Sequence, residues 1–359
     1  MPPHEKTLET MAHDHLTARR RARTLVVAAL VVGLVFSIIA NISLGQYTIG
    51  LADVWREILS GPAGATEQAP NVANGVIWNI RLPRLALGLL VGAALAVAGT
   101  VLQGLLGNPL AEPGVVGVTS GAGVGAAAAI VFGLNFLGTA TVPFFAFIAA
   151  IITTWLVYRL STIGGQVRVL TLILTGIAVN AVAGAAISFL IFLAPTTARE
   201  EIIFWQMGSL NGAKWSQVAT IAIPIIACIV AAIAIAHWLD VLSLGERAAR
   251  HAGIPVNLLR PLVVGISTAL AAAAVSFAGI IGFVGLIVPH ILRQALGPSN
   301  RWLVPLSAIG GAVLVTAADL IARILIAYSE LPIGIFTALV GGPVFFILLR
   351  RNLIRTGAH

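Results

Sequence analysis

Two arginines one helical turn apart carry the most specific chemistry in this sequence. Arg81 and Arg84 lie in the segment RLPR, directly before a long apolar run. A guanidinium makes directional, paired hydrogen bonds to carboxylates, so the pair could bind an acidic surface. Pro83 between them is typical of a first helical turn, where its missing N–H costs nothing. The alternative interpretation is that both arginines extend toward a membrane surface to keep their charges in water.

A charged segment at residues 239–260, LDVLSLGERAARHAGIPVNLLR, is the second candidate. Ser243 and Glu246 have the spacing of a capping box, which predicts that Ser243 caps a short helix of about eight residues. Gly253 and Pro255 would end it. A solvated loop is the usual explanation for such charge, but a capped helix between two apolar segments favours contact with a partner. A third motif, Gly107-Asn-Pro-Leu-Ala-Glu-Pro-Gly114, by itself predicts a stiff turn.

Catalytic chemistry and bound cofactors are not expected. Asp319 and Arg323 stand at i, i+4 and can pair on one helix face, but one such pair is thin support for a proton relay. The nucleotide motif GxxxxGK[ST] is absent, and the lysines are Lys6 and Lys214. The lone Cys228 excludes an internal disulfide and a cysteine-based metal site, and the seven histidines lack metal-binding spacing.

The elements that must position these groups are membrane spans. The 359 residues are 58% hydrophobic and only 9% charged, with a mean hydropathy of +1.00, whereas soluble domains carry about 25% charged residues. So few charges cannot cover a soluble protein of this length. This excludes a soluble enzyme, a disordered chain and a nucleic-acid-binding domain. The net charge of +8 is then explained by basic residues that mark cytoplasmic loops.

Apolar blocks give the number of spans. They cover residues 24–44, 82–106, 114–134, 139–158, 169–194, 215–238, 261–296, 303–328 and 332–350. As one helix, block 261–296 would be about 54 Å long, against a hydrocarbon core of about 30 Å. We therefore expect it to break at Ser276–Gly279, which gives ten transmembrane helices in an all-α fold.

The basic residues orient these ten helices. The arginine-rich start and the basic end of the chain predict that both termini are cytoplasmic, which requires an even number of crossings. The exceptions on the outside are Arg56, Arg81, Arg84, Arg199, Lys214 and Arg323. The expected organisation is a cytoplasmic tail at 1–23, a single transmembrane domain at 24–351 that includes the loop 239–260, and a C-terminal tail at 352–359.

Taken in order, the motifs resemble those of FecCD-type permeases of bacterial ABC importers, which take up vitamin B12, iron–siderophores and haem. The similar stretches are 80–127, 204–215, 244–255, 278–293 and 318–351. The resemblance implies a fold like that of the vitamin B12 importer permease, assembled as a homodimer in the lipid of the bacterial cytoplasmic (inner) membrane. It also implies separate ATP-binding subunits on the cytoplasmic face and a periplasmic or lipid-anchored substrate-binding protein outside, with no role for nucleic acid.

The resemblance also assigns roles to residues. Arg81, Arg84 and Arg323 would receive glutamates of the binding protein. The residues that contact the ATPase would be Leu244, Gly245, Glu246, Ala249 and Gly253. Those that narrow a cytoplasmic gate would be Asn108 and Leu110. Segment 161–170, where a second gate would lie, departs from the family pattern and carries no assigned residue.

The sequence says least about which substrate is carried. The histidines lie near the termini or the cytoplasmic ends of the predicted spans, so strong side-chain ligation of a haem iron inside the membrane is not expected. The stretch FWQMGSLNGAKW at 204–215 is more similar to iron-chelate and haem permeases than to vitamin B12 permeases. We predict haem or a ferric siderophore. The alternatives are a cobalamin permease or a proton-coupled secondary transporter, which would need more buried acidic groups than Asp319.

Overall fold

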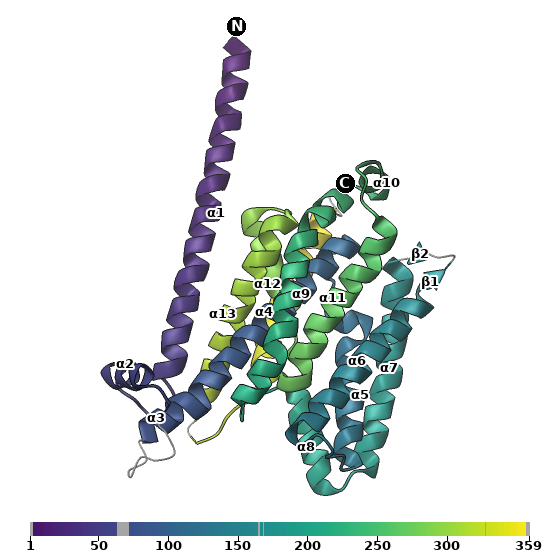
Figure 1. Ribbon diagram of the computed structural model, residues 1–359. Coiled ribbons are helices and arrows are strands. Elements are labelled where there is room, and N and C mark those ends of the chain that lie inside the picture. The colour runs from purple at the N-terminus through teal and green to yellow at the C-terminus, as the bar shows by residue number, and fades with distance from the viewer. Residues whose placement is uncertain (1–2, 63–71, 164–165, 168, 327, 357–359) are drawn as a thin grey trace.

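The computed structural model describes residues 3–62, 72–163, 166–167, 169–326 and 328–356. It is a long bundle of helices (Figure 1). The helices longer than twelve residues are α1 (Pro3–Ser43), α4 (Leu82–Leu106), α5 (Val118–Val131), α6 (Thr141–Leu160), α7 (Val169–Leu193), α9 (Trp215–Leu242), α11 (Val256–Ala278), α12 (Val284–Leu296), α13 (Asn300–Ile324) and α14 (Ile333–Thr356).

Short elements connect them. These are α2 (Leu51–Ser60), α3 (Val72–Val76), the π-helical η1 (Ile77–Arg81), the 3-10 turns η2 (Pro113–Val116) and η3 (Gly138–Ala140), α8 (Thr196–Met207) and α10 (Glu246–His251). Two two-residue strands, β1 (Thr162–Ile163) and β2 (Gln166–Val167), pair antiparallel. They lie in segment 161–170, whose residues 164, 165 and 168 are outside the described residues.

Seven described helical stretches are long and apolar enough to cross a membrane: residues 22–43, 72–106, 138–160, 170–193, 215–242, 256–278 and 300–324. Three shorter apolar helices, 118–131, 284–296 and 333–347, fill the remaining positions of the expected order. The predicted all-helical membrane architecture is therefore confirmed in its main features. The number of crossings stays a prediction, because α5 and α12 are shorter than the roughly 20 residues that span a bilayer.

The predicted break in block 261–296 is confirmed. Helix α11 ends at Ala278, and α12 begins at Val284. Gly279 lies between them with a φ of 67°, a left-handed conformation that residues with a side chain rarely adopt. An ideal Cβ at Gly279 would also lie only 2.2 Å from the carbonyl oxygen of Trp205. Glycine at this position therefore lets the chain turn against the end of α8.

The helix that carries the arginine pair starts earlier than expected. Helical structure begins at Val72 and runs through η1 into α4, not from residue 82. Polar residues such as Asn74 and Asn79 interrupt the apolar pattern there, so hydropathy alone did not reveal this helical extension. A proline ring inside a helix clashes with the carbonyl four residues earlier, and the wider π-helical turn just before Pro83 accommodates it.

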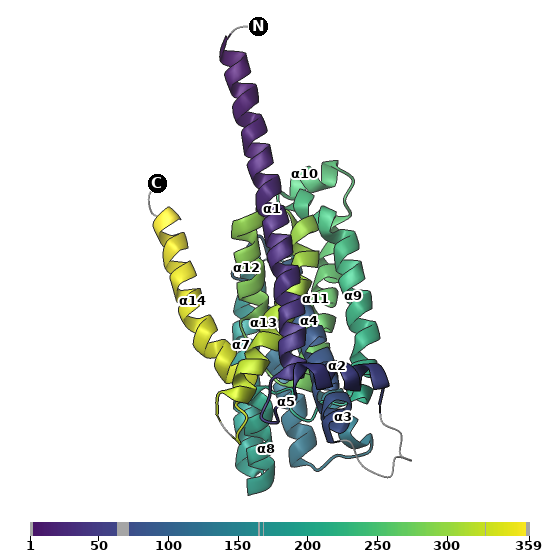
Figure 2. The same ribbon diagram turned by 90° about the vertical axis from the view of Figure 1, so that its left-hand side faces the viewer.

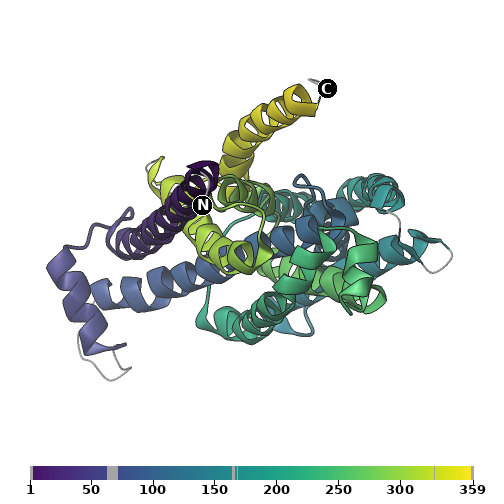
Figure 3. The same ribbon diagram turned by 90° about the horizontal axis from the view of Figure 1, so that it is seen from above.

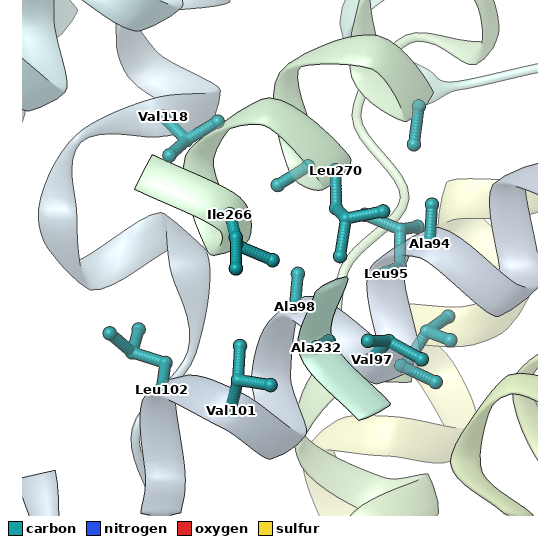
Figure 4. Close-up of a cluster of buried hydrophobic side chains, with 14 of the residues drawn as sticks. Ala94, Leu95, Val97, Ala98, Val101, Leu102, Val118, Ala232, Ile266 and Leu270 are labelled. Atoms are coloured by element: carbon teal, nitrogen blue, oxygen red, sulfur yellow. The ribbon is translucent and has the colours of Figure 1, made fainter. Parts of the chain in front are cut away.

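Helix α4 forms the centre of the bundle. Its Val97, Val101 and Leu102 are fully buried, and they lie with Ala232 of α9 and Ile266 of α11 in one apolar cluster (Figure 4). On its other flank, glycines bring backbones together. An ideal Cβ at Gly92 would lie 2.2 Å from Gly311 O of α13, and one at Gly99 only 1.9 Å from Gly285 O of α12. Close packing of this kind is how small residues associate helices in lipid.

Helices α1 and α13 share a small buried polar contact. Ser37 Oγ lies 2.7 Å from Thr316 Oγ1, and Asn41 Nδ2 donates to Thr316 O at 3.1 Å. All three side chains are buried. These hydrogen bonds join the first apolar helix to one formed by residues about 275 positions later in the chain.

The bundle has two distinct ends. Helix α1 begins and α14 ends at the same end as α10, which we call the α10 end (Figures 1 and 2). Helices α2, α3 and α8 lie at the opposite end, here called the α2 end. The C-terminal part of α14 diverges from the bundle (Figures 2 and 3). Helical structure reaches from Pro3 to Thr356, so it extends into both predicted tails.

Candidate functional site

Arg84 is the centre of a buried ion-pair cluster at the α2 end. Its Nε and Nη2 donate to Asp319 at 2.9–3.1 Å, and its Nη1 donates to both carboxylate oxygens of Glu330 at 2.9 Å. The Arg84 and Asp319 side chains are 4% and 2% exposed, whereas Glu330 is 32% exposed. Arg84 thus joins α4 to α13 and to the loop before α14.

Arg81 and Arg323 are also buried, and both bind backbone carbonyls. Arg81 Nη1 donates to Ser43 O at 3.0 Å and also contacts Ile42 O, and its Nη2 contacts Tyr47 O. Arg323 Nη2 donates to Asn41 O at 3.0 Å and to Leu44 O at 3.1 Å. The C-terminal end of α1 and the following turn therefore hold both guanidinium groups.

The three arginines line one pocket of about 630 Å³ at the α2 end, together with Glu330, Tyr328 and others. The sequence placed them outside as possible free docking groups, but each residue is 3–6% exposed in this structure. Arg323 Nε is buried without a hydrogen-bond partner among the described residues. Three guanidinium groups face two carboxylates, Asp319 and Glu330, so the cluster retains a positive charge.

One predicted ion pair is wrong. Asp319 and Arg323 stand on the same helix, but the Asp319 carboxylate pairs with Arg84 of α4. The Arg323 guanidinium is held instead by the carbonyl oxygens of Asn41 and Leu44. Arg84 reaches Asp319 with two donors in the fork geometry that a carboxylate accepts.

The NPLAEP turn is anchored by α7 and by the connection between α11 and α12. Asn108 Oδ1 accepts from Leu110 N at 3.0 Å within the turn, and both side chains are half-buried. Glu112 Oε1 accepts from Phe283 N at 3.1 Å, between α11 and α12. Asn180 Nδ2 of α7 donates to Gly114 O at 3.1 Å. Burial raises the pKa of the Glu112 carboxyl, although the hydrogen bond from Phe283 opposes this.

The charged segment at the α10 end forms a short projecting helix. Glu246 Oε1 accepts from Arg250 at 2.7 Å and its Oε2 accepts from Arg260 at 2.7 Å. Hydrogen bonding from Arg250, with the charges of Arg260 and Arg250, holds the pKa of Glu246 below its usual range. Ala249 is fully buried, whereas Leu244 is 76% exposed at the tip. The segment therefore presents an apolar side chain on a charge-braced turn.

The predicted Ser243 cap is wrong. Helix α10 begins at Glu246, after Gly245 with a φ of 109°, and it has six residues, not about eight. Ser243 instead follows the end of α9, where its Oγ donates to Asp240 O at 2.6 Å. Gly253, with a φ of 80°, ends the turn and donates its N–H to Arg250 O, as the sequence indicated.

Two contributors to the arginine pocket were missed. Glu330 supplies the second carboxylate, and Gln46 Nε2 lies 3.3–3.4 Å from the carbonyl oxygens of Arg323, Ile326 and Ser329. The signal for Glu330 was its position in the loop next to Asp319 and Arg323. The sequence carried no signal for Gln46, because a single amide side chain in a short turn is common and does not indicate a site.

The fold and its polar ends define a class: a multi-pass membrane protein built as a transport bundle. The sequence model of the FecCD transport family matches residues 33–351. The chain therefore belongs to the FecCD transport family. It is an ABC importer permease of the bacterial inner membrane, in a family whose ATPase is a separate subunit.

Relatives and a solved structure agree with this assignment. The chain is 43% identical over 287 residues to the cobalamin import system permease protein BtuC of Halobacterium salinarum, covering 80% of this chain and 76% of that one. It is 35% identical over 338 residues to the hemin transport system permease protein HmuU of Yersinia pestis, covering 93% and 98%. An inward-facing ABC transporter described as of metal-chelate type superposes with a TM-score of 0.78 at 33% identity, covering 90% and 98%.

Proposed function

We propose that this permease passes an iron chelate, haem or a ferric siderophore, from a substrate-binding protein into the cytoplasm. The observation that carries the proposal is that the hemin permease HmuU aligns over almost its whole length, as does the metal-chelate type transporter. Cobalamin is the second candidate, because the BtuC of Halobacterium salinarum has a higher identity to this chain over a shorter alignment.

We also propose that two copies of the chain enclose the translocation path. The mostly exposed apolar surface of α7 supports such pairing.

Uptake into proteoliposomes tests this function. The permease, its ATPase and its binding protein are reconstituted, and accumulation of haem, a ferric siderophore and cobalamin is measured with ATP inside. We expect ATP-dependent uptake of an iron chelate. Uptake of cobalamin alone would favour the second candidate. Uptake that continues without the ATPase and follows a pH gradient would contradict an ATP-driven importer.

We infer that the arginine pocket is the docking site and that the α2 end faces outward. Because Arg84 already holds two carboxylates, an incoming glutamate would have to exchange with one of them. Asp319 is buried, so the partly exposed Glu330 is the carboxylate that can leave. Glu330 lies three residues before α14, so its exchange would detach from Arg84 the loop that leads into that helix.

Glu330→Gln tests the exchange. The neutral amide is a weaker partner for Arg84, and hydrogen bonds to charged groups contribute about 1.5–3 kcal/mol, so the binding protein should bind roughly tenfold more tightly. Surface plasmon resonance on permease in nanodiscs measures this affinity, with Glu200→Gln as the control because Glu200 is an exposed glutamate on α8. Unchanged or weaker binding by Glu330→Gln would exclude Glu330 as a competitor.

We infer that Leu244, Gly245, Glu246, Ala249 and Gly253 form the ATPase contact at the α10 end, which would then be cytoplasmic. Glu246→Ala should strongly reduce substrate-stimulated ATP hydrolysis. It should change the free energy of unfolding by less than about 1 kcal/mol, since partly exposed ion pairs contribute little. The pKa of Glu246 is lowered, so its ion pairs persist at neutral pH and are lost only as pH falls through that lowered value.

The measurement is ATP hydrolysis by the reconstituted complex at neutral pH, with thermal unfolding of the same samples. Normal stimulation of ATP hydrolysis in Glu246→Ala would contradict the contact.

For the cytoplasmic gate, we infer that Asn108 and Leu110 narrow the path. Support comes from the anchoring of their turn to α7 and to the α11–α12 break.

A further inference from the structure

Helix α2 lies across the bundle at its α2 end, away from both candidate contact sites on α10 and the NPLAEP turn. It follows α1 after a seven-residue turn and runs roughly perpendicular to it (Figure 1). From above it is the short purple-blue helix beyond the ends of α1 and α4 (Figure 3). It lies at the end of an apolar span, packs one face on the bundle and leaves its other faces exposed.

The helix has three distinct faces. Leu51, Trp55 and Leu59 follow one another at i, i+4 and i+8, so they share a face, and they are 57%, 56% and 83% exposed. Val54 and Glu57 are buried, and Val54 packs on a small cluster formed with Ile42, Ile49, Ile77 and Leu85. A third face carries Asp53 and Arg56, which pair at 3.1 Å with both side chains exposed.

Three tryptophans lie in or near this helix. Trp78 Nε1 donates to Glu57 O at 3.0 Å, and Trp215 Nε1 donates to Trp78 O at 2.8 Å. Trp55 adds a third indole, 56% exposed. Indoles combine an apolar ring with one N–H donor and gather where a membrane meets water. This chain of contacts therefore marks the α2 end as the level of a membrane surface.

These observations favour lipid over a protein as the occupant of the apolar face. The exposed side of α1, which includes Val32 and Phe36, is apolar and leads directly toward α2. A helix with one large apolar side and a charged opposite side lies in the plane of the interface, with the apolar side between the acyl chains. A partner arriving from water would meet the Asp53 and Arg56 side first.

We propose that α2 is an interfacial membrane-binding helix. Leu51, Trp55 and Leu59 insert into the leaflet at the α2 end, and Asp53 and Arg56 face water. The turn before α2 supplies Tyr47 O to Arg81, so the depth of α2 in the leaflet sets the height of the arginine pocket above it.

Spin labels on single cysteines test this placement in the full chain. Cys228→Ser removes the only native cysteine, and labels are then attached at Leu59→Cys or at the matched position Arg56→Cys. The protein is reconstituted in vesicles of phosphatidylethanolamine and phosphatidylglycerol. Power saturation compares accessibility to oxygen, which partitions into lipid, with accessibility to a soluble nickel chelate.

The label at position 59 should be more accessible to oxygen than to nickel, and the label at 56 should show the reverse. Nickel accessibility at 59 equal to that at 56 would place the face in water and overturn the proposal. Protection of position 59 from both reagents would show a protein covering it and would also overturn it. If Leu59→Cys does not fold, Leu51→Cys on the same face provides the same readout.

Discussion

Arg84→Ala is expected to lower the free energy of unfolding by about 3–5 kcal/mol, which is the usual cost of removing one partner from a buried ion pair. The change leaves the Asp319 carboxylate, 2% exposed, without its guanidinium partner and releases Glu330. Thermal unfolding of the purified protein in detergent measures the loss. Arg56→Ala is the matched control, because Arg56 pairs on the surface and should cost less than about 1 kcal/mol.

A second variant separates an orphaned charge from lost packing. Adding Asp319→Asn to Arg84→Ala should restore part of the stability, because the remaining buried group is then neutral. If the loss of stability in the double variant equals the sum of the losses in the two single variants, the charges are not coupled.

Because Arg84 is buried and paired, charge reversal at this residue is a poor test of docking: it would destabilise the fold as well as change the charge of the docking site. Glu330→Gln avoids this problem.

Gly99→Val is expected to prevent α4 from packing on α12. An ideal Cβ at Gly99 would lie 1.9 Å from Gly285 O, and backbone cannot rotate away as a side chain can. Overpacking of a tight core costs about 1–3 kcal/mol and sometimes more, and here two helices must separate. The yield of folded protein and its unfolding temperature in detergent are the measurements.

Gly265→Ala in α11 is a control for adding a side chain to a helical glycine that has space around it. Nothing lies within 4 Å of an ideal Cβ at Gly265, so alanine should be neutral or stabilise the helix by about 0.5–1 kcal/mol. Equal stability of Gly99→Val and the native protein would mean that the α4–α12 contact is looser than the structure has it.

Hydropathy was a good guide to the bundle because each span is a long apolar run. The break between α11 and α12 was predicted because block 261–296 is longer than one helix needs to cross a membrane. The extension from Val72 to Arg81 was missed, since polar side chains there are satisfied by tertiary contacts and hydropathy cannot detect such partners. Helix α2 was missed for a related reason: Asp53, Arg56 and Glu57 interrupt its apolar residues, so its ten residues do not form an apolar run.

The candidate sites were predictable in position but not in partners. Residue types and their place in the chain located Arg81, Arg84, Arg323 and the 239–260 segment at opposite ends of the bundle. Which carboxylate Arg84 binds depends on how α4, α13 and the loop before α14 pack, and residue spacing along one helix favoured the wrong pair. Ser243 does not cap α10, because the residue directly before its first residue, Glu246, is Gly245 with a φ of 109°.

The hydrogen bonds between α1 and α13 have a consequence for how the chain is made. Asn41 is inserted early, but its acceptor Thr316 lies 275 residues later. At synthesis rates of about 5–20 residues per second, roughly 15 to 55 seconds pass before that acceptor exists. During this interval Ser37 and Asn41 face lipid, the insertion machinery or each other. The buried polar contact of the first span therefore forms only after α13 has been synthesised.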